Sequence, residues 1–176
     1  MRVTALYPRI HRLATWPVVA LLSVAIVLCV QGFIWRQAVL GWPNQVPDAH
    51  LGYTPAEAQQ LLAALGAPGR HLYATTQLTL DVIFPLVYGL FFAVLMVRLY
   101  PLEQAGILFT PLLMVVADLA ENVLTAILAW NYTGPLSVLA WFAAGCTVAK
   151  WIALVITLVL LVLGGVRGLR APSPAG

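Results

Sequence analysis

The sequence predicts an all-α integral membrane protein: an antiparallel bundle of four transmembrane helices, formed by a single membrane domain over residues 1–176. Composition is the first indication, because 62% of the residues are hydrophobic and only 9% are charged, whereas a soluble domain is about a quarter charged. The second is that the apolar residues fall in four long runs. Such a chain exposes most of its surface to lipid rather than to water.

The four predicted spans cover residues 16–35, 72–97, 107–130 and 136–166. Each has the roughly 20 residues that a helix needs to cross about 30 Å of hydrocarbon. Trp16 and Trp35 bracket the first span as interfacial anchors, with Arg36 just outside it. The last span is longer than a bilayer requires, so it must tilt, bend near Gly145 or project from the membrane.

Arginine placement predicts the orientation of these spans. Six arginines fall in segments that share one side of the membrane and two fall on the other; the six are Arg2, Arg9, Arg12, Arg98, Arg167 and Arg170, and the two are Arg36 and Arg70. By the positive-inside rule both termini are then cytoplasmic, in the inner membrane of a bacterium. Residues 98–106 form a short inner connection and residues 131–135 a short outer one.

The long first outer loop, residues 36–71, carries the signature of a short amphipathic helix at about residues 55–65. Thr54 is an N-cap residue, Pro55 suits the first helical position, and Glu57 completes a capping box. Gly66, with Pro68 beyond it, predicts the end of the helix. We expect this helix to lie either over the outer mouth of the bundle or among the lipid headgroups. The tail, residues 171–176, is expected to be disordered.

Four ionisable residues lie within the predicted spans: Asp81, Asp118, Glu121 and Lys150. On insertion scales each charge costs roughly 2.5–3.5 kcal/mol at the centre of a bilayer, so such residues are usually functional. Counted along the helices at about 1.5 Å per residue, all four lie between the outer half and the midplane. We therefore expect one polar pocket in the outer half of the bundle.

This pocket is expected to combine the four charged residues with the polar and aromatic side chains on the same helix faces. The candidate catalytic residues are Asp81, Asp118, Glu121 and Lys150. The candidate ligand-binding residues are Arg70, Tyr73, Gln77, Tyr88, Asn122 and Trp151. Thr125 and Thr147 follow the same helical spacing on the third and fourth spans.

The charges in the pocket do not balance. Three carboxylates and one ammonium would sum to −2, which a medium of low dielectric opposes. Either Arg70 joins the group, or at least one carboxyl is protonated. Asp118 and Glu121, one turn apart on one face, are expected to share a proton, an arrangement that suits acid–base chemistry or a proton relay. A structural network that fixes helix register is the alternative.

Pro85 interrupts the hydrogen bonding of the second span. It has no N–H to donate to the carbonyl of Asp81, one turn back. Either a kink there opens room beside Asp81, or a neighbouring helix supplies a donor to the freed carbonyl.

Several other classes of site have no support. No histidine lies in a span and Lys150 would compete for the carboxylates, so no metal is expected, and no cofactor motif occurs. Nucleic-acid binding is excluded because there is no basic stripe with interleaved aromatic residues. Cys29 and Cys146 fall in apolar runs and are interpreted as small hydrophobic residues.

The tracts Gly69-Arg70, Asp81 with Phe84-Pro85, and Asp118 with Glu121-Asn122 resemble those of small, uncharacterised bacterial four-span membrane proteins. The architecture is also similar to the sterol-isomerase and sigma-2-receptor type, which binds lipophilic amines or sterols with intramembrane carboxylates. This second resemblance is one of architecture alone, so no residue role is carried over from it.

The leading hypothesis is a bacterial inner-membrane protein that binds a small amphiphilic or lipidic molecule in the pocket, where the carboxylates could also transform it by acid–base chemistry. Whether the chain is an enzyme stays open. One alternative is a small proton-coupled transporter, which with four spans would work as an oligomer such as a homodimer. Another is a non-catalytic subunit of a larger membrane complex.

Overall fold

The computed structural model describes residues 5–41, 46–132 and 138–170, and within these ranges it contains helices and no strand. The helices are α1 (Tyr7–Leu13), α2 (Trp16–Leu40), α3 (Pro55–Ala64), α4 (Gly66–Gln77), α5 (Leu80–Leu99), α6 (Phe109–Trp130) and α7 (Val138–Arg170), with 3₁₀ helices η2 (Pro47–Ala49) and η3 (Leu102–Leu108). The predicted disordered tail, residues 171–176, lies outside the described residues, as does most of the predicted connection at residues 131–135.

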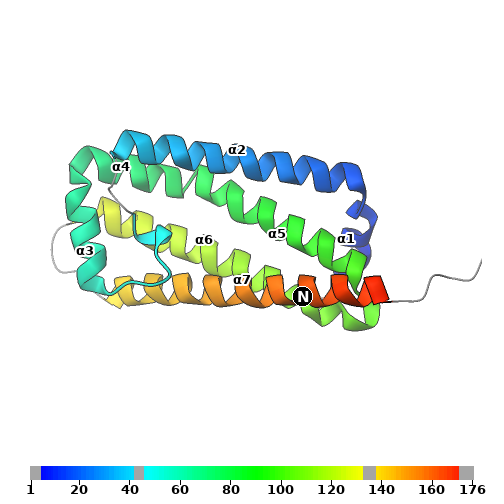
Figure 1. Ribbon diagram of the computed structural model, residues 1–176. Coiled ribbons are helices and arrows are strands. Elements are labelled where there is room, and N and C mark those ends of the chain that lie inside the picture. The colour runs from blue at the N-terminus through cyan, green and yellow to red at the C-terminus, as the bar shows by residue number, and fades with distance from the viewer. Residues whose placement is uncertain (1–4, 42–45, 133–137, 171–176) are drawn as a thin grey trace, which may run out of the picture.

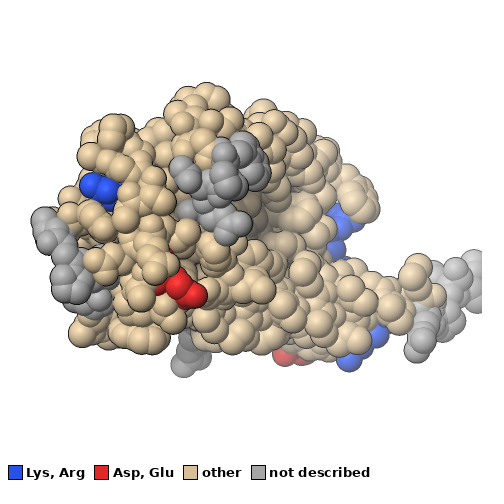
Figure 2. Space-filling model, turned by 60° about the vertical axis from the view of Figure 1, so that its left-hand side comes forward, with Lys and Arg blue, Asp and Glu red and all other residues tan. Residues whose placement is uncertain are grey.

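Four helical segments are long and apolar enough to cross a membrane: α2, α4 with α5, η3 with α6, and α7. Figure 1 shows α2, α5, α6 and α7 running side by side in alternating directions, with α3 at one end of the bundle and α1 at the other. We call these the α3 end and the α1 end. Most of the surface seen in Figure 2 is uncharged. The predicted class, an all-α membrane protein with four transmembrane helices, is confirmed.

All four spans are longer than predicted, and in two of them this changes what was expected of particular residues. α2 continues to Leu40 and stops at Gly41, whose φ of 82° suits a residue without a side chain. Arg36 therefore lies inside the helix rather than beyond it. α7 runs from Val138 to Arg170 and is not interrupted at Gly145.

The second predicted span is divided, which the sequence did not indicate. α4 ends at Gln77, α5 begins at Leu80, and Thr79 between them has φ −122° and ψ −84°. The Thr79 hydroxyl donates to the carbonyl of Thr75 at 2.8 Å, a local bond of the kind that competes with helical hydrogen bonding. Pro85 lies inside α5, which continues through it. The interruption at Leu78 and Thr79 thus lies nearly two turns before the proline.

The capping box that begins α3 is confirmed. The Thr54 side chain accepts from the backbone N–H of Glu57 at 3.2 Å, and the Glu57 carboxylate accepts from the Thr54 N–H at 2.7 Å. These bonds lower the pKa of Glu57, because hydrogen bonds from the Thr54 backbone and side chain favour the charged form. Gly66 has a φ of 63° and follows the end of α3 closely. No loop comes after it, because α4 begins there and includes Pro68.

α3 packs against the bundle. Its buried residues Ala58 and Leu62 join a hydrophobic cluster with Val46, Tyr73 and residues of α6 and α7. Of the two predicted positions for this helix, the one across the end of the bundle is observed (Figure 1).

The short helix α1 was not predicted. Its Tyr7 hydroxyl donates to the carbonyl of Tyr100 at 2.7 Å, and the Tyr7 ring packs with Met96 and Leu108. These contacts pack the segment before α2 against the connection between α5 and α6.

Candidate functional site

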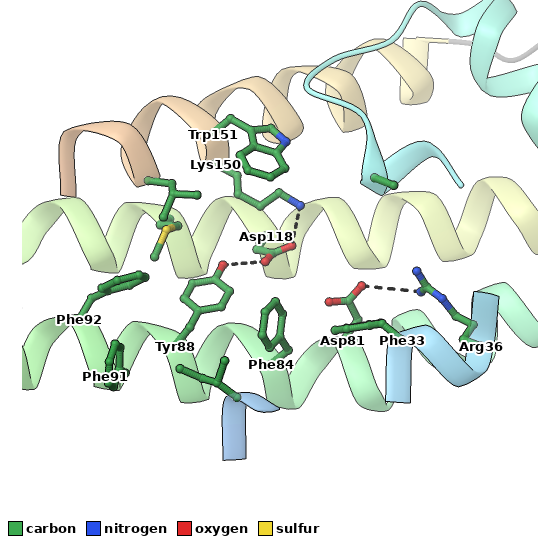
Figure 3. A pocket seen from close by; sticks show the side chains of 14 residues that line it. Phe33, Arg36, Asp81, Phe84, Tyr88, Phe91, Phe92, Asp118, Lys150 and Trp151 are labelled. Carbon is green, nitrogen blue, oxygen red and sulfur yellow. Dashed lines mark hydrogen bonds and ion pairs between the residues drawn. The ribbon is translucent and has the colours of Figure 1, made fainter. Parts of the chain in front are cut away.

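A cavity of about 560 Å³ lies among α2, α5, α6, α7 and η2. Its lining is polar toward the α3 end, where the charged side chains come from four different helices: Arg36, Asp81, Asp118 and Lys150. Toward the middle of α5 the lining is apolar and aromatic, with Phe91, Phe92, Met114 and Leu154. Figure 3 shows Tyr88 and Phe84 between these two regions. The cavity thus has a polar end and an apolar end, as expected of a pocket for an amphiphile.

Lys150 joins two carboxylates of α6. Its Nζ lies 2.6 Å from Glu121 Oε2 and 3.1 Å from Asp118 Oδ1. The Tyr88 hydroxyl donates to Asp118 Oδ2 at 2.6 Å, and the Thr147 hydroxyl lies 2.5 Å from Glu121 Oε1. We call these five residues the Lys150 cluster. They come from α5, α6 and α7, so the cluster also fixes the packing of these three helices.

Arg36 pairs with the third carboxylate. Its Nη1 lies 4.0 Å from Asp81 Oδ2, and its guanidinium stacks over the rings of Phe33 and Tyr73, 5.0 and 5.5 Å from their centroids. Arg36 is 4% exposed and lies within the apolar helix Trp16–Leu40, not just outside the first span as predicted. The span was ended too early, because Trp35 was taken as its boundary.

Arg70, a candidate ligand-binding residue and one of the two ways in which the charges were expected to balance, is not among the described residues that line the cavity. Its Nη1 donates to the carbonyl of Leu62 at 3.2 Å, and its guanidinium stacks 4.2 Å from the ring centroid of Tyr132. Because α4 turns Arg70 toward α3, the side chain stabilises the junction of these helices. Arg36, rather than Arg70, is the arginine that lines the cavity.

The interruption between α4 and α5 supports the Arg36–Asp81 pair. Asp81 lies in the first turn of α5, where the helix dipole favours a negative charge. The Asp81 carbonyl, freed by Pro85, accepts a hydrogen bond from Asn122 Nδ2 of α6. A neighbouring helix therefore satisfies the carbonyl, which was one of the two predicted outcomes.

Apart from Arg70, the predicted site residues fall into three groups. Those that line the cavity are Asp81, Tyr88, Asp118, Lys150 and Trp151. Glu121 and Asn122 are fully buried and lie behind this layer, in contact with Lys150 and with the Asp81 backbone. Tyr73 and Gln77 are also fully buried and are not among the described lining residues. Neither polar atom of the Gln77 side chain has a hydrogen-bond partner among the described residues.

Sequence reasoning missed three contributors to the site. Arg36 lies on a buried stripe of α2 with Leu22 and Cys29, at intervals of seven residues; continuing the first apolar run to Leu40 would have placed Arg36 inside the span but would not have shown its partner. Thr147 was recognised on the polar face of the last span but not as a partner of Glu121. The aromatic wall could not be distinguished from lipid-facing residues, because aromatic side chains suit both environments.

The connection between α2 and α3 covers part of the cavity. Ala49 of η2 lines it, and Trp151 Nε1 donates to the carbonyl of His50 at 3.0 Å. Val46, 1% exposed, anchors this connection in the cluster beneath α3.

The arrangement can hold a polar group between two ion pairs and can exchange a proton with it. The charged residues sum to −1 when all are ionised, from Asp81, Asp118 and Glu121 against Arg36 and Lys150. In the described part of the chain, no three histidine, cysteine, aspartate or glutamate side chains are grouped so as to hold a metal ion.

Comparison with known proteins adds no assignment. No protein-family model, no curated protein and no solved structure matches the chain.

Proposed function

We propose that this protein binds a small amphiphilic or lipidic molecule in the cavity and that the charged residues there act on it by acid–base chemistry. One observation carries the proposal: a cavity within a membrane-spanning bundle has ion pairs at one end and an aromatic, aliphatic wall at the other. The polar group of the ligand would lie between the Arg36–Asp81 and Lys150–Asp118 pairs. Its apolar part would lie along Phe91, Phe92 and Leu154.

The size of the cavity supports a ligand of moderate size. A volume of about 560 Å³ falls in the range of roughly 300–1,000 Å³ that is typical of small-molecule sites. Because the walls come from α2 on one side and α7 on the other, a molecule dissolved in the bilayer would enter between these helices. The ligand would then reach the site without passing through water.

We also propose that the protein resides in a bacterial inner membrane with both termini in the cytoplasm. Arg9 and Arg12 belong to α1 or its flank, Arg98 ends α5, and Arg167 lies near the end of α7, so these cations gather at the α1 end. Arg70 belongs to α4, at the other end. The positive-inside rule places the α1 end on the cytoplasmic side.

A structural network alone and a proton-coupled transporter are less well supported. The Lys150 cluster does fix helix packing, but a network needs no cavity beside it.

For transport, a polar path should continue from Lys150 toward the α1 end. The next described polar contact in that direction is the hydrogen bond between Thr157 and Thr110, and Ala153, Leu154 and Met114 separate it from Lys150.

Filling the apolar end of the cavity tests the proposal. Leu154→Trp would place an indole in the cavity, whereas Val155→Trp, at a position 59% exposed on the same helix, would place it outside. Chains extracted with their native lipid by a styrene–maleic acid copolymer would be analysed for bound molecules by mass spectrometry. We expect a molecule that is retained by the native chain and by Val155→Trp and lost from Leu154→Trp. Equal retention by both variants would contradict binding in this cavity.

A further inference from the structure

The hydroxyl of Thr147 lies between two acceptors. It is 2.5 Å from Glu121 Oε1 and 3.1 Å from the carbonyl oxygen of Ala143, one turn earlier in α7. A threonine hydroxyl has one proton to donate and lone pairs with which to accept. With one proton, Thr147 donates to one of these two oxygens at a time, and because it is fully buried, water does not replace either partner.

This geometry satisfies Glu121 in both of its protonation states. When Glu121 is ionised, Thr147 donates to Oε1. When Oε1 carries a proton, the carboxylic acid donates to the Thr147 oxygen, and Thr147 turns its own proton to the Ala143 carbonyl. Each state keeps its hydrogen bonds, so neither has the cost of a buried polar group left without a partner.

Asp118 has no such freedom. Its two partners, the Tyr88 hydroxyl and the Lys150 ammonium, both donate to it. A protonated Asp118 would have to donate to the Tyr88 oxygen and displace the hydroxyl proton of Tyr88. Among the described residues the Tyr88 hydroxyl makes no hydrogen bond other than that to Asp118, whereas the Thr147 hydroxyl has the Ala143 carbonyl as a second acceptor. The surroundings of Asp118 therefore favour a carboxylate.

Charge balance calls for one proton among the three carboxyls, which the hydrogen-bond geometry assigns to Glu121. The groups that face Glu121 are Lys150 and Cys146 from α7, Tyr88 from α5 and Asp118 from α6 itself, with Asp81 of α5 and Arg36 of α2 beyond them. Arg70, the arginine of α4, is turned toward Tyr132. One proton on Glu121 leaves Arg36 and Lys150 to balance Asp81 and Asp118, which gives a neutral site.

We propose that Glu121 holds the exchangeable proton of this site, that Thr147 is the positioning residue that allows Glu121 to gain and lose it, and that Asp118 stays ionised. This inference rests on the proposed acid–base function and specifies which carboxyl carries it out. When a bound base takes the proton, the base gains one positive charge. Glu121 becomes a carboxylate that Lys150 already contacts at Oε2 and Thr147 stabilises at Oε1.

Infrared spectroscopy of the full-length chain in lipid nanodiscs tests this without a ligand. The C=O stretch of a protonated carboxylic acid is separate from the bands of carboxylates. In a background with Glu57→Gln and Glu103→Gln, Glu121 is the remaining glutamate. Carboxyl-¹³C glutamate or carboxyl-¹³C aspartate would be introduced by cell-free synthesis. At neutral pH we expect one acid band, which moves with labelled glutamate and not with labelled aspartate.

Two hydroxyl deletions that leave every charge unchanged then test the role of Thr147. Thr147→Val should move the acid band to higher frequency, because the acid loses its acceptor, and Thr147→Ser should keep it in place. Tyr88→Phe, which removes the donor to Asp118, should not move it. A band that follows labelled aspartate, a band that responds to Tyr88→Phe and not to Thr147→Val, or no acid band would each overturn the inference. Because no ligand is present, these outcomes are independent of the binding test with Leu154→Trp.

Discussion

Replacing Lys150 by methionine should be among the most destabilising single changes in this protein. Methionine keeps an unbranched side chain and removes the ammonium that contacts Glu121 at 2.6 Å and Asp118 at 3.1 Å. Loss of one partner from a buried ion pair costs about 3–5 kcal/mol, and here the Asp118 carboxylate loses its cation and the Glu121 carboxyl group loses a contact as well, so we expect the upper part of that range, about 4–5 kcal/mol. The side chain of Lys150 is only 13% exposed, so little of this cost is screened by water.

A double-mutant cycle separates the ion pair from general disruption. Glu121→Gln alone leaves Lys150 with Asp118 and should cost about 1–3 kcal/mol. In the double variant the two losses overlap, so we expect a coupling energy of about 1–3 kcal/mol between the sites.

The free energy of unfolding would be measured by titration with sodium dodecyl sulfate in mixed micelles, followed by tryptophan fluorescence. Ile152→Met, at a position 54% exposed on the same helix, is the matched control for introducing methionine. If the effects of Lys150→Met and Glu121→Gln were additive within about 0.5 kcal/mol, the two side chains would be independent and the reasoning refuted.

Two further predictions concern hydrogen bonds away from Lys150. Asn122→Ala should lower the free energy of unfolding by about 1–3 kcal/mol in the same titration, because the buried carbonyl of Asp81 loses its donor. Pro85→Ala restores an N–H that can donate to this carbonyl, so Asn122→Ala should cost less in that background. An unchanged cost would contradict the role assigned to Asn122. The lowered pKa of Glu57 means that its contribution to α3 is fully present above the ordinary glutamate pKa of about 4.3 and is lost as pH falls through the lowered value. Hydrogen exchange of α3 amides should therefore quicken on acidification in the native chain and less so in Glu57→Gln, and an equal response in both would exclude the capping box as the cause.

Periodicity and composition were enough to predict that four apolar helices cross the membrane and which of their faces meet, but not their bounds. Four ionisable residues in apolar helices had to turn inward, and Asp81, Asp118, Glu121 and Lys150 do so. The interruption at Leu78 and Thr79 was beyond this reasoning, because neither residue is a strong helix breaker and only the tertiary structure decides whether the Thr79 hydroxyl bonds to Thr75.

Arg36 shows a different limit. A charged residue beside a tryptophan at the end of an apolar run is usually an interfacial anchor, and nothing local distinguishes that role from an ion pair with a residue far along the chain. The partner of Arg36 is Asp81, so the pair can be recognised only once α2 is placed against α5. The contact between Arg70 and Tyr132 likewise joins residues far apart in the chain, so it too can be recognised only from the packing of the helices.

The sparse burial of α2 has a consequence for how the protein is made. Only 11% of the most apolar part of α2 is buried, against 50% for the span that contains α6. Transmembrane helices insert first and associate afterwards, and the Lys150 cluster needs only α5, α6 and α7. The cavity gains its remaining wall, and Asp81 its arginine, only when α2 docks. We therefore expect α2, although it precedes the other three spans in the chain, to dock after α5, α6 and α7 have associated, so that the order of synthesis and the order of assembly of these four spans differ.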